Sequence, residues 1–157
     1  MPEQELRLKP FTPAQERVGN LIIRVMSALN VFVFRLSKGR LGGRFRGGAP
    51  VLLLTTIGRK SGERRTAPVL YLADRNRLVV VASKGGFSTH PFWYKNLESN
   101  PSVEVEIGGE RREMTAKRAG DAEKRVLWPK LVEMYHDFDD YQARTRREIP
   151  VVILSAL

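Results

Sequence analysis

From residue 51 onward the chain alternates short apolar runs with turn residues, and this alternation constrains the fold more than any other feature of the sequence. The clearest run is Val51-Leu-Leu-Leu-Thr-Thr-Ile57, which ends at Gly58 and the pair Ser61-Gly62. Runs of this length, rich in branched side chains and bounded by glycine, are typical of buried strands. The connections between runs are short, which favours antiparallel pairing.

The same patterns predict five more strands and three helices. The further strands are expected over Arg65–Ala73, Arg77–Ser83, Ser102–Ile107, Glu110–Arg118 and Pro150–Ser155. The helices are expected over Pro91–Ser99, Asp121–Tyr135 with Asp121 as the cap, and Asp139–Arg146. Strict alternation in Ser102–Ile107 leaves one strand face in water, so Glu104 and Glu106 are expected to be solvated. The fold class is therefore mainly β with helices (α+β), a small β-barrel with helical decoration.

Residues 1–48 form an N-terminal region in this interpretation, and residues 49–157 form the barrel domain. Met1–Phe11 is expected to be a loose arm. Thr12 and Pro13 then have the N-cap and first-turn residue types of a helix that carries the apolar segment Val18–Leu36. The helix is amphipathic because four polar residues share one stripe: Asn20, Arg24, Ser27 and Arg35.

The apolar segment is nearly long enough to cross a bilayer. Arg24, near its middle, opposes crossing at a cost of roughly 2.5–3.5 kcal/mol on insertion scales. A basic, glycine-rich stretch follows as far as Arg46, which suits peripheral attachment of residues 18–46 to the cytoplasmic face of an anionic membrane. The equal alternative is a helix packed on its own domain or on the second subunit of a homodimer.

The formal net charge of +10 first points to nucleic acid. Residues 1–48 hold nine basic and three acidic side chains, a net of +6, whereas residues 49–157 hold eighteen and fourteen, a net of +4. The excess is thus concentrated near the N-terminus. The strands also lack the interleaved aromatic and basic residues of an oligonucleotide-binding barrel. A nucleic-acid partner is accordingly disfavoured.

Reactive residue types are few in this chain. It has no cysteine and two histidines, which excludes disulfides, thiolate chemistry and a multi-histidine metal site within one chain. His90 and His136 lack the sequence context of a base beside a nucleophile and are expected at the surface. No glycine pattern of a Rossmann or P-loop fold occurs. No metal ligand and no catalytic side chain is therefore assigned.

Two glycine-rich loops have the composition of an anion site. Thr55–Arg65 places Ser61 and several cations between Gly58 and Gly62, whose backbones allow a ligand to approach closely. Composition alone favours a hairpin turn that is merely solvated. Val80–Gly86 repeats the arrangement, with a strand that ends in a small polar residue, a lysine and two glycines. Both loops would face one ligand if the two strands were neighbours.

Two aromatic groups follow the loops. Three adjacent aromatics cannot all point inward from one helix, so at least one is expected to line a cleft or an interface: Phe92, Trp93 and Tyr94. The alternative makes Trp93 and Leu97 the core face of that helix. The second group recurs at three-residue steps, a spacing more common in core or lid packing: Tyr135, Phe138 and Tyr141.

In this order, four motifs resemble the deazaflavin-dependent nitroreductase family: Thr55–Gly62, Ala82–Gly86, Pro91–Leu97 leading to Asn100-Pro101, and Trp128–Tyr135. Each motif is weak alone, and four in register are specific. The resemblance implies a split β-barrel of the FMN-binding-protein-like type that binds coenzyme F420. It further implies an oxidoreductase that transfers a hydride from reduced F420 to a quinone, a nitroaromatic or an activated enone. An FMN-binding oxidoreductase of the same fold is the alternative.

The resemblance also implies residue roles. It sets the anionic phosphate and tail of F420 against a cationic turn, which reverses the preference for a solvated turn: Arg59, Lys60, Ser61, Gly62, Glu63, Arg64 and Arg65. Two further segments would border the deazaflavin: Val81, Ala82, Ser83 and Lys84, and Phe92, Trp93, Tyr94, Lys95 and Asn96. The substrate side would be closed by Ser83, Trp93, Tyr135, Phe138 and Tyr141. The family has tyrosine where this chain has Phe138, which lacks a hydroxyl for an acceptor oxygen.

Overall fold

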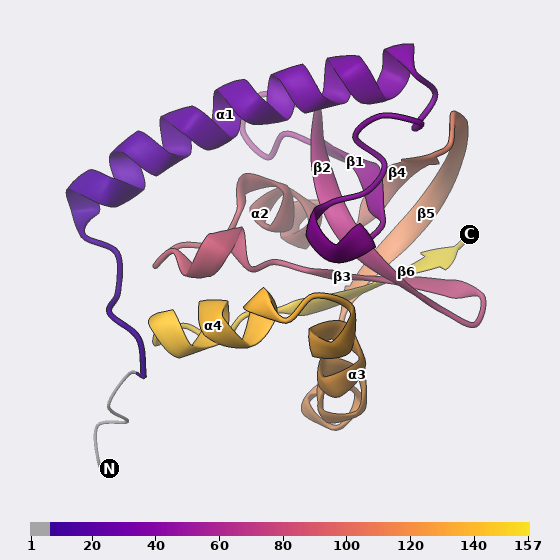
Figure 1. Ribbon diagram of the computed structural model, residues 1–157. Helices are drawn as coiled ribbons and strands as arrows, with labels where there is room; N and C mark the ends of the chain where they lie inside the picture. Colours follow the sequence, from indigo (N-terminus) through magenta and orange to yellow (C-terminus); the bar gives the residue numbers. More distant parts are fainter. Residues whose placement is uncertain (1–6) are drawn as a thin grey trace.

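A computed structural model describes residues 7–157, apart from the side chain of Arg46 (Figure 1). Its centre is a closed barrel in which neighbouring strands are antiparallel, in the order β1-β2-β3-β6-β5-β4. The strands are β1 (Val51–Ile57), β2 (Arg64–Asp74), β3 (Arg77–Val81), β4 (Ser102–Ile107), β5 (Glu110–Arg118) and β6 (Val151–Ala156). The expected barrel is confirmed, and β3 stops two residues earlier than the sequence predicts.

Tight turns fix the register of the hairpins. Gly108 and Gly109 join β4 to β5 with φ angles of 58° and 85°, the left-handed region that a two-residue hairpin turn requires. At the β2–β3 turn, Asp74 pairs with Arg77 across the ladder, and Arg75 takes a positive φ of 57°. The Arg77 guanidinium donates to the Asp74 carboxylate at 2.6 Å and closes this turn.

The helices among the described residues lie outside the barrel. They are α1 (Pro13–Leu36), α2 (Phe92–Ser99), α3 (Asp121–Met134) and α4 (Asp137–Arg144), with short 3-10 turns η1 (Arg46–Gly48) and η2 (Lys84–Gly86). The expected capping role of Asp121 is wrong, because Gly120 occupies the N-cap position and no side chain caps the helix. Asp121 instead lies in the first turn, where its negative charge interacts favourably with the positive end of the helix dipole.

Two hydrophobic clusters lie on opposite faces of the barrel sheet. The inner cluster fills the barrel and includes Tyr94 and Leu97 of α2, which are 1% and 5% exposed. The core face of α2 is therefore Tyr94 with Leu97, while Trp93 is only partly buried. The outer cluster packs α3 and α4 against β3 and β6, below the barrel in Figure 1. Phe138, 2% exposed, belongs to this second cluster.

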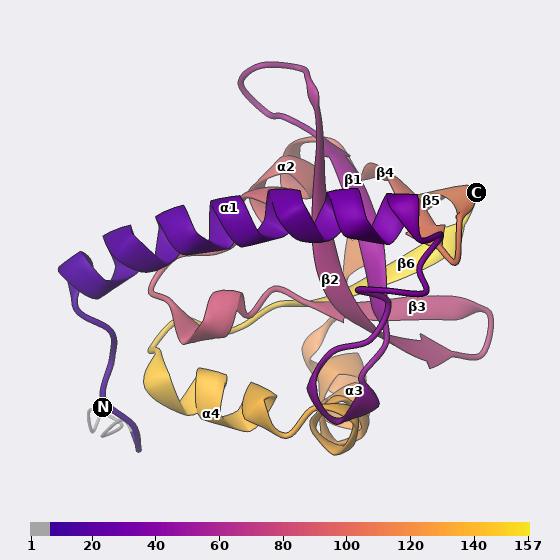
Figure 2. The ribbon, with the colours of Figure 1, turned by 45° about the horizontal axis from the view of Figure 1, so that its top comes forward.

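The long helix α1 crosses the outside of the barrel (Figures 1 and 2), and most of its large apolar side chains are exposed. The side toward the barrel is mostly small or polar and includes Glu16, Gly19, Ser27, Asn30 and the buried Phe34. The outward residues are each more than half exposed: Val18, Leu21, Ile22, Val25, Met26, Leu29, Phe32 and Leu36. By length and composition, α1 could cross a membrane. The loose arm expected from Met1 falls partly outside the described residues.

Two polar contacts attach α1 to the barrel. Near its N-terminus, the Glu16 carboxylate accepts from the backbone N–H and from the hydroxyl of Ser88, both at 2.8 Å. Near its C-terminus, Arg35 donates to Glu106 at 3.4 Å. Glu106 is 6% exposed, so its expected solvation is wrong: the end of α1 covers that part of β4. Glu104 is half-buried and pairs with the exposed Arg64.

Candidate functional site

The β1–β2 turn is closed on itself by backbone hydrogen bonds. The N–H of Gly58 donates to the Glu63 carbonyl at 2.7 Å, and the N–H of Gly62 donates to the Gly58 carbonyl at 2.8 Å. A Cβ atom at Gly58 would lie 2.6 Å from Oγ of Ser61 and 3.2 Å from the Glu63 carbonyl oxygen, so a larger residue there would displace the Ser61 hydroxyl. Ser61 Oγ accepts from the Glu63 N–H at 3.2 Å. These groups hold the turn in shape, and they leave its cationic side chains to meet a ligand.

Asn96 ties this turn to α2. Its Oδ1 accepts from the backbone N–H of Arg59 at 3.1 Å, and its Nδ2 donates to Oγ1 of Thr56 at 3.0 Å. Asn96 and Thr56 are both buried, so these bonds are shielded from water. In Figure 2 the turn projects beyond the barrel on the side of α2. Two of the sequence motifs thus meet at one buried amide.

The loop after β3 approaches α2 from its other end. Nζ of Lys84 lies 5.3 Å from the ring centroid of Phe92, and Nζ of Lys95 lies 5.6 Å from the same ring. Lys84 also donates to Oγ1 of Thr89 at 3.4 Å. Burial lowers the pKa of Lys84, and the charge of Lys95 lowers it further. Two ammonium groups are therefore held around one exposed aromatic ring.

The fourth motif is connected to the same loop by Tyr141 of α4, which contacts Tyr135 of the motif and Gly86 of the loop. A Cβ atom at Gly86 would lie 2.7 Å from the carbonyl oxygen of Tyr141, so only glycine allows this close contact. The Tyr135 hydroxyl donates to Oδ2 of Asp137 at 3.1 Å and lies 2.9 Å from the Tyr141 hydroxyl. Burial raises the pKa of Tyr135, with further contributions from Tyr141 and Asp137. The four motifs form one chain of contacts.

The cations differ in whether they have partners. Arg64 pairs with Glu104, and Arg65 pairs with Glu63, each at 2.8 Å. Within residues 7–157, no ion pair involves four others: Arg59, Lys60, Lys84 and Lys95. Cations without carboxylate partners are free to bind an anionic ligand.

Some predicted site residues are covered. Val81 and Ala82 are 5% and 0% exposed and join the outer and inner clusters respectively. Tyr94 points into the barrel. Tyr135 is 6% exposed, and Phe138 packs edge-on against it with ring centroids 5.0 Å apart. A ligand over this surface would therefore meet these residues chiefly through backbone atoms or ring edges, whereas Phe92 is open to solvent.

Sequence reasoning missed the part that Arg147 plays. Its guanidinium donates to the carbonyl oxygens of Ala82, Ser83 and Phe87 and lies 3.1 Å from Nδ1 of His90. His90 is expected at the surface, and its ring is half-buried there, 4.8 Å from that of Tyr94. His136 is exposed as expected. Arg147 follows Arg144 and Arg146, and nothing in the sequence distinguishes it from them.

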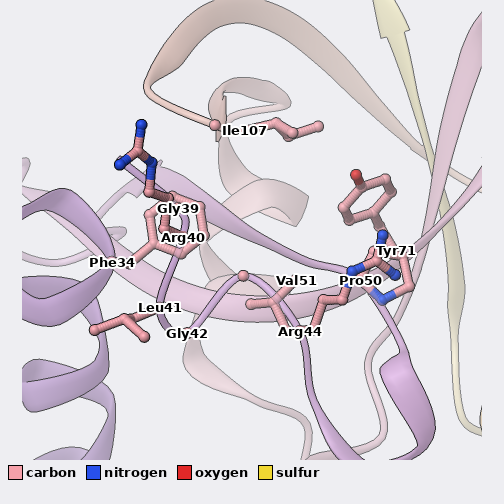
Figure 3. A pocket seen from close by; sticks show the side chains of 12 residues that line it. Phe34, Gly39, Arg40, Leu41, Gly42, Arg44, Pro50, Val51, Tyr71 and Ile107 are labelled. Atoms are coloured by element: carbon pink, nitrogen blue, oxygen red, sulfur yellow. The ribbon is translucent and has the colours of Figure 1, made fainter. Parts of the chain in front are cut away.

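Two hollows lie elsewhere on the surface. One, of about 400 Å³, lies between the segment after α1 and the barrel. Figure 3 shows Arg40 at one end of it and Tyr71 at the other. The second, of about 310 Å³, lies between the start of α1, the loop at Gly86 and Ser88, and residues 144–147. The residues of the four sequence motifs form one surface, which we call the four-motif surface. Of these two hollows, the second touches it, at Gly86.

The comparisons with known proteins show the family to which the chain belongs. The family model described as F420H(2)-dependent quinone reductase matches residues 26–156. The chain belongs to this family. The relative Rv3178 of Mycobacterium tuberculosis, named for F420H(2)-dependent quinone reduction, is 48% identical over 73% of this chain and 97% of its own length.

Two solved structures resemble this family member. An F420-H2 dependent reductase, FDR-A, is 38% identical, with a TM-score of 0.63 over 68% of this chain and 94% of that one. A domain-swapped dimer is 32% identical, with a TM-score of 0.65 over 92% of this chain and all of that one. The split barrel, the oxidoreductase class and coenzyme F420 expected from the sequence are thereby confirmed.

The residues of the four-motif surface fit this coenzyme. F420 carries a phosphodiester and a glutamate-rich tail, so it needs cations that are not already neutralised. Arg59 and Lys60 on the turn, Lys84 before α2 and Lys95 on α2 are cations of this kind, since none of them is in an ion pair within residues 7–157. The exposed ring of Phe92 between the two lysines offers an apolar surface next to the charges.

Proposed function

We propose that this quinone reductase family member uses the four-motif surface to pass a hydride from reduced F420 to a quinone. The observation that carries this proposal is the set of four cations without carboxylate partners, held on segments that Asn96 and Phe92 connect. When bound, reduced F420 supplies the hydride. The protein's own part is to bind, orient and exclude water.

In this proposal Arg59 and Lys60 hold the phosphate and the tail. Ser61 and Gly62 shape the turn, while Glu63 orients Arg65 and Glu104 orients Arg64 through their ion pairs. Ser83 and Lys84 border the deazaflavin together with the α2 residues, and Trp93 lies nearest its face. Val81, Ala82 and Tyr94 support that border from beneath, since their side chains are buried.

The acceptor would lie between Ser83 and the Tyr135, Phe138 and Tyr141 cluster. A tyrosine hydroxyl has one proton to donate. The Tyr135 proton goes to Asp137, so the short contact between the two hydroxyls uses the proton of Tyr141. Phe138 offers none. Ser83 is then the side chain at this edge that keeps a hydroxyl proton for a quinone oxygen.

Reoxidation of reduced F420 by menadione tests the activity directly. The purified protein should restore the absorbance of the oxidised coenzyme, and binding titrations should favour F420 over FMN. Tight FMN binding without F420 affinity would overturn the proposal. Haem, offered in the same titration, should not bind.

A charge-matched pair of variants tests the tail assignment. Arg59→Gln with Lys60→Gln should weaken F420 binding about tenfold or more, since charge-assisted hydrogen bonds contribute roughly 1.5–3 kcal/mol each. A deazaflavin analogue without phosphate and tail should bind as before. Arg112→Gln with Lys117→Gln, exposed cations on β5, should change neither affinity. Equal losses for F420 and the analogue would contradict a tail contact.

We further propose that α1 makes the enzyme a homodimer. The exposed apolar side of α1 favours a partner, since soluble chains rarely leave so continuous an apolar face in water. A solved structure that resembles this chain over 92% of its length is a domain-swapped dimer. Light scattering should give twice the chain mass. Lysine at Leu21, Val25 and Leu29 should give the monomer.

An anionic membrane is the alternative partner of this apolar face, which would then attach the enzyme to the cytoplasmic side in place of forming the dimer. Residues 1–48 would serve attachment and residues 49–157 would bind the coenzyme. Exposed Arg17, Arg24, Lys38 and Arg40 supply positive charge beside the apolar side chains, as anionic lipid requires. Flotation of the full chain with phosphatidylglycerol vesicles, but not with neutral ones, is expected. Equal flotation of a chain that starts at Ala49 would exclude the helix as the anchor.

A further inference from the structure

The guanidinium of Arg147 spans the loop that carries Ser83 and Lys84. Its Nη2 donates to the Ser83 carbonyl at 2.6 Å, on the β3 side of η2. Its Nε donates to the Phe87 carbonyl at 2.7 Å, on the far side of η2. Its Nη1 donates to the Ala82 carbonyl at 3.1 Å. One planar side chain thus fixes both ends of the turn between Ser83 and Phe87.

The backbone between these ends is in an unfavourable conformation. Lys84, Gly85 and Gly86 follow one another with φ angles of 45°, 62° and 83°. The two glycines adopt the left-handed region readily, whereas Lys84 pays a steric penalty of about 1–2 kcal/mol there. Such a conformation persists only where surrounding contacts fix it. Since Lys84 follows Ser83, its ammonium position depends on the carbonyls that Arg147 holds.

Among the described residues, the side-chain hydrogen bonds of Arg147 go to this loop and to His90, and the charge of Glu16 also acts on it. Within residues 7–157, no ion pair joins it to a carboxylate. Burial lowers its pKa to about 10, so it stays charged at neutral pH. A half-buried cation matched to three carbonyl oxygens has strong, directional hydrogen bonds. Lysine cannot reproduce that planar arrangement of donors.

We propose that Arg147 is a positioning residue of the coenzyme site, which acts by holding residues 82–90 so that Ser83 and Lys84 face the coenzyme. This inference rests on the proposed function. Arg147 does not itself touch the reacting groups, because its donors are directed at backbone oxygens. Small displacements of positioning groups cost large factors in rate, so its loss is felt at the site.

His90 completes the arrangement in one protonation state. Nδ1 of His90 lies 3.1 Å from Nη1 of Arg147, so it must accept, and the ring must be neutral with its proton on Nε2. The ring also packs on Tyr94 of α2. The other charged groups that face it are Glu98, Arg118 and Lys95. Protonation would set a second cation against the guanidinium, so the loop is held best when His90 is neutral.

Arg147→Met tests the inference by two independent readouts. The first is hydrogen exchange of the uncomplexed protein, in which amides of residues 83–88 should exchange at least about tenfold faster, while those of β4 and β5 stay unchanged. The second is steady-state kinetics with reduced F420, in which kcat/KM for the acceptor should fall about tenfold to a hundredfold. Arg147→Lys should recover part of both, because it restores charge without the planar donors.

Arg77→Met is the matched control. Arg77 is also a half-buried arginine with two side-chain partners, Asp74 and Glu123, but it lies at the β2–β3 turn. The Arg77→Met variant should have a lower melting temperature than the wild type, with no faster exchange at residues 83–88 and no change in kcat/KM. Unchanged exchange in Arg147→Met would overturn the inference, whatever the activity. Failure of the wild type to bind F420 would overturn the proposed function instead, and the exchange readout would still decide whether Arg147 holds the loop.

Discussion

Asn96 of α2 donates from Nδ2 to Oγ1 of Thr56 in β1 at 3.0 Å, and both side chains are buried. The same amide accepts the N–H of Arg59. The two hydrogen bonds of this amide therefore link the barrel, the helix that we propose to border the deazaflavin, and the turn that carries the cations. Since the turn projects from the barrel, this contact sets the direction in which Arg59 and Lys60 point.

Asn96→Leu should destabilise the protein by about 2–3 kcal/mol, because it keeps the volume but leaves a buried hydroxyl and a backbone N–H without partners. F420 binding should weaken as well, since the turn loses its anchor. Urea unfolding measures the first effect and coenzyme titration the second. Thr56→Val removes the other partner. The double variant should cost less than the sum of the singles by about 1 kcal/mol. Strict additivity would mean that the two side chains do not interact.

The barrel could be predicted because its signals are local. Every strand is a short run bounded by turn residues, and the glycine pair at Gly108-Gly109 fixes one hairpin directly. The orientation of α1 could not be predicted in this way. An amphipathic helix normally buries its apolar face, but here Leu21, Val25 and Leu29 are exposed and Phe34 is the residue of the helix that is buried. The burial of Glu106 has the same origin, since its partner Arg35 lies 71 residues away in the chain.

The candidate site shows the same division. The four motifs that resemble the family contain the residues of the turn, the loop and α2. The positions of their glycines are explained by positive φ angles or by close contacts. Arg147 acts on that loop from a distant position in the chain and meets His90 at the end of the loop, and neither residue carries a local signal. Pattern and spacing identify what a loop presents to a ligand. They do not identify the residues that hold the backbone of the loop in place, because those residues reach it through tertiary contacts.

The two glycines of η2 should differ in their tolerance of alanine. Both have positive φ, so alanine is strained at either position by about 1 kcal/mol. Only at Gly86 would the new methyl group meet the Tyr141 carbonyl, at 2.7 Å, while Gly85 has open space. Gly86→Ala should therefore cost roughly 1–3 kcal/mol more than Gly85→Ala in urea unfolding. Equal costs would show that η2 and α4 separate without penalty.

His90 should make stability depend on pH in the mildly acidic range. Burial lowers its pKa below the ordinary 6.5, and Arg147 lowers it further. At a pH between the lowered pKa of the folded chain and the ordinary pKa of 6.5 in the unfolded chain, the unfolded chain binds more protons than the folded chain. The free energy of unfolding therefore decreases as the pH falls below 6.5. His90→Gln keeps an acceptor and cannot titrate. The wild type should lose more stability than this variant between about pH 7.5 and about pH 5.5 in urea unfolding. Parallel losses would mean that His90 is protonated equally in both states.

Glu104 and Glu106 look alike in the sequence and should behave differently when neutralised. The Glu106 carboxylate is buried and accepts from Arg35 of α1 at 3.4 Å and from Arg111 of β5 at 3.2 Å. Glu106→Gln should cost about 2 kcal/mol, because two guanidinium groups lose a charged acceptor. Glu104→Gln should cost less than about 1 kcal/mol, since its partner Arg64 is exposed. Since Arg35 then loses its barrel contact, trypsin should cleave the Glu106 variant faster after Lys38 and Arg40. Equal cleavage of both variants would show that α1 is held by its other contacts alone.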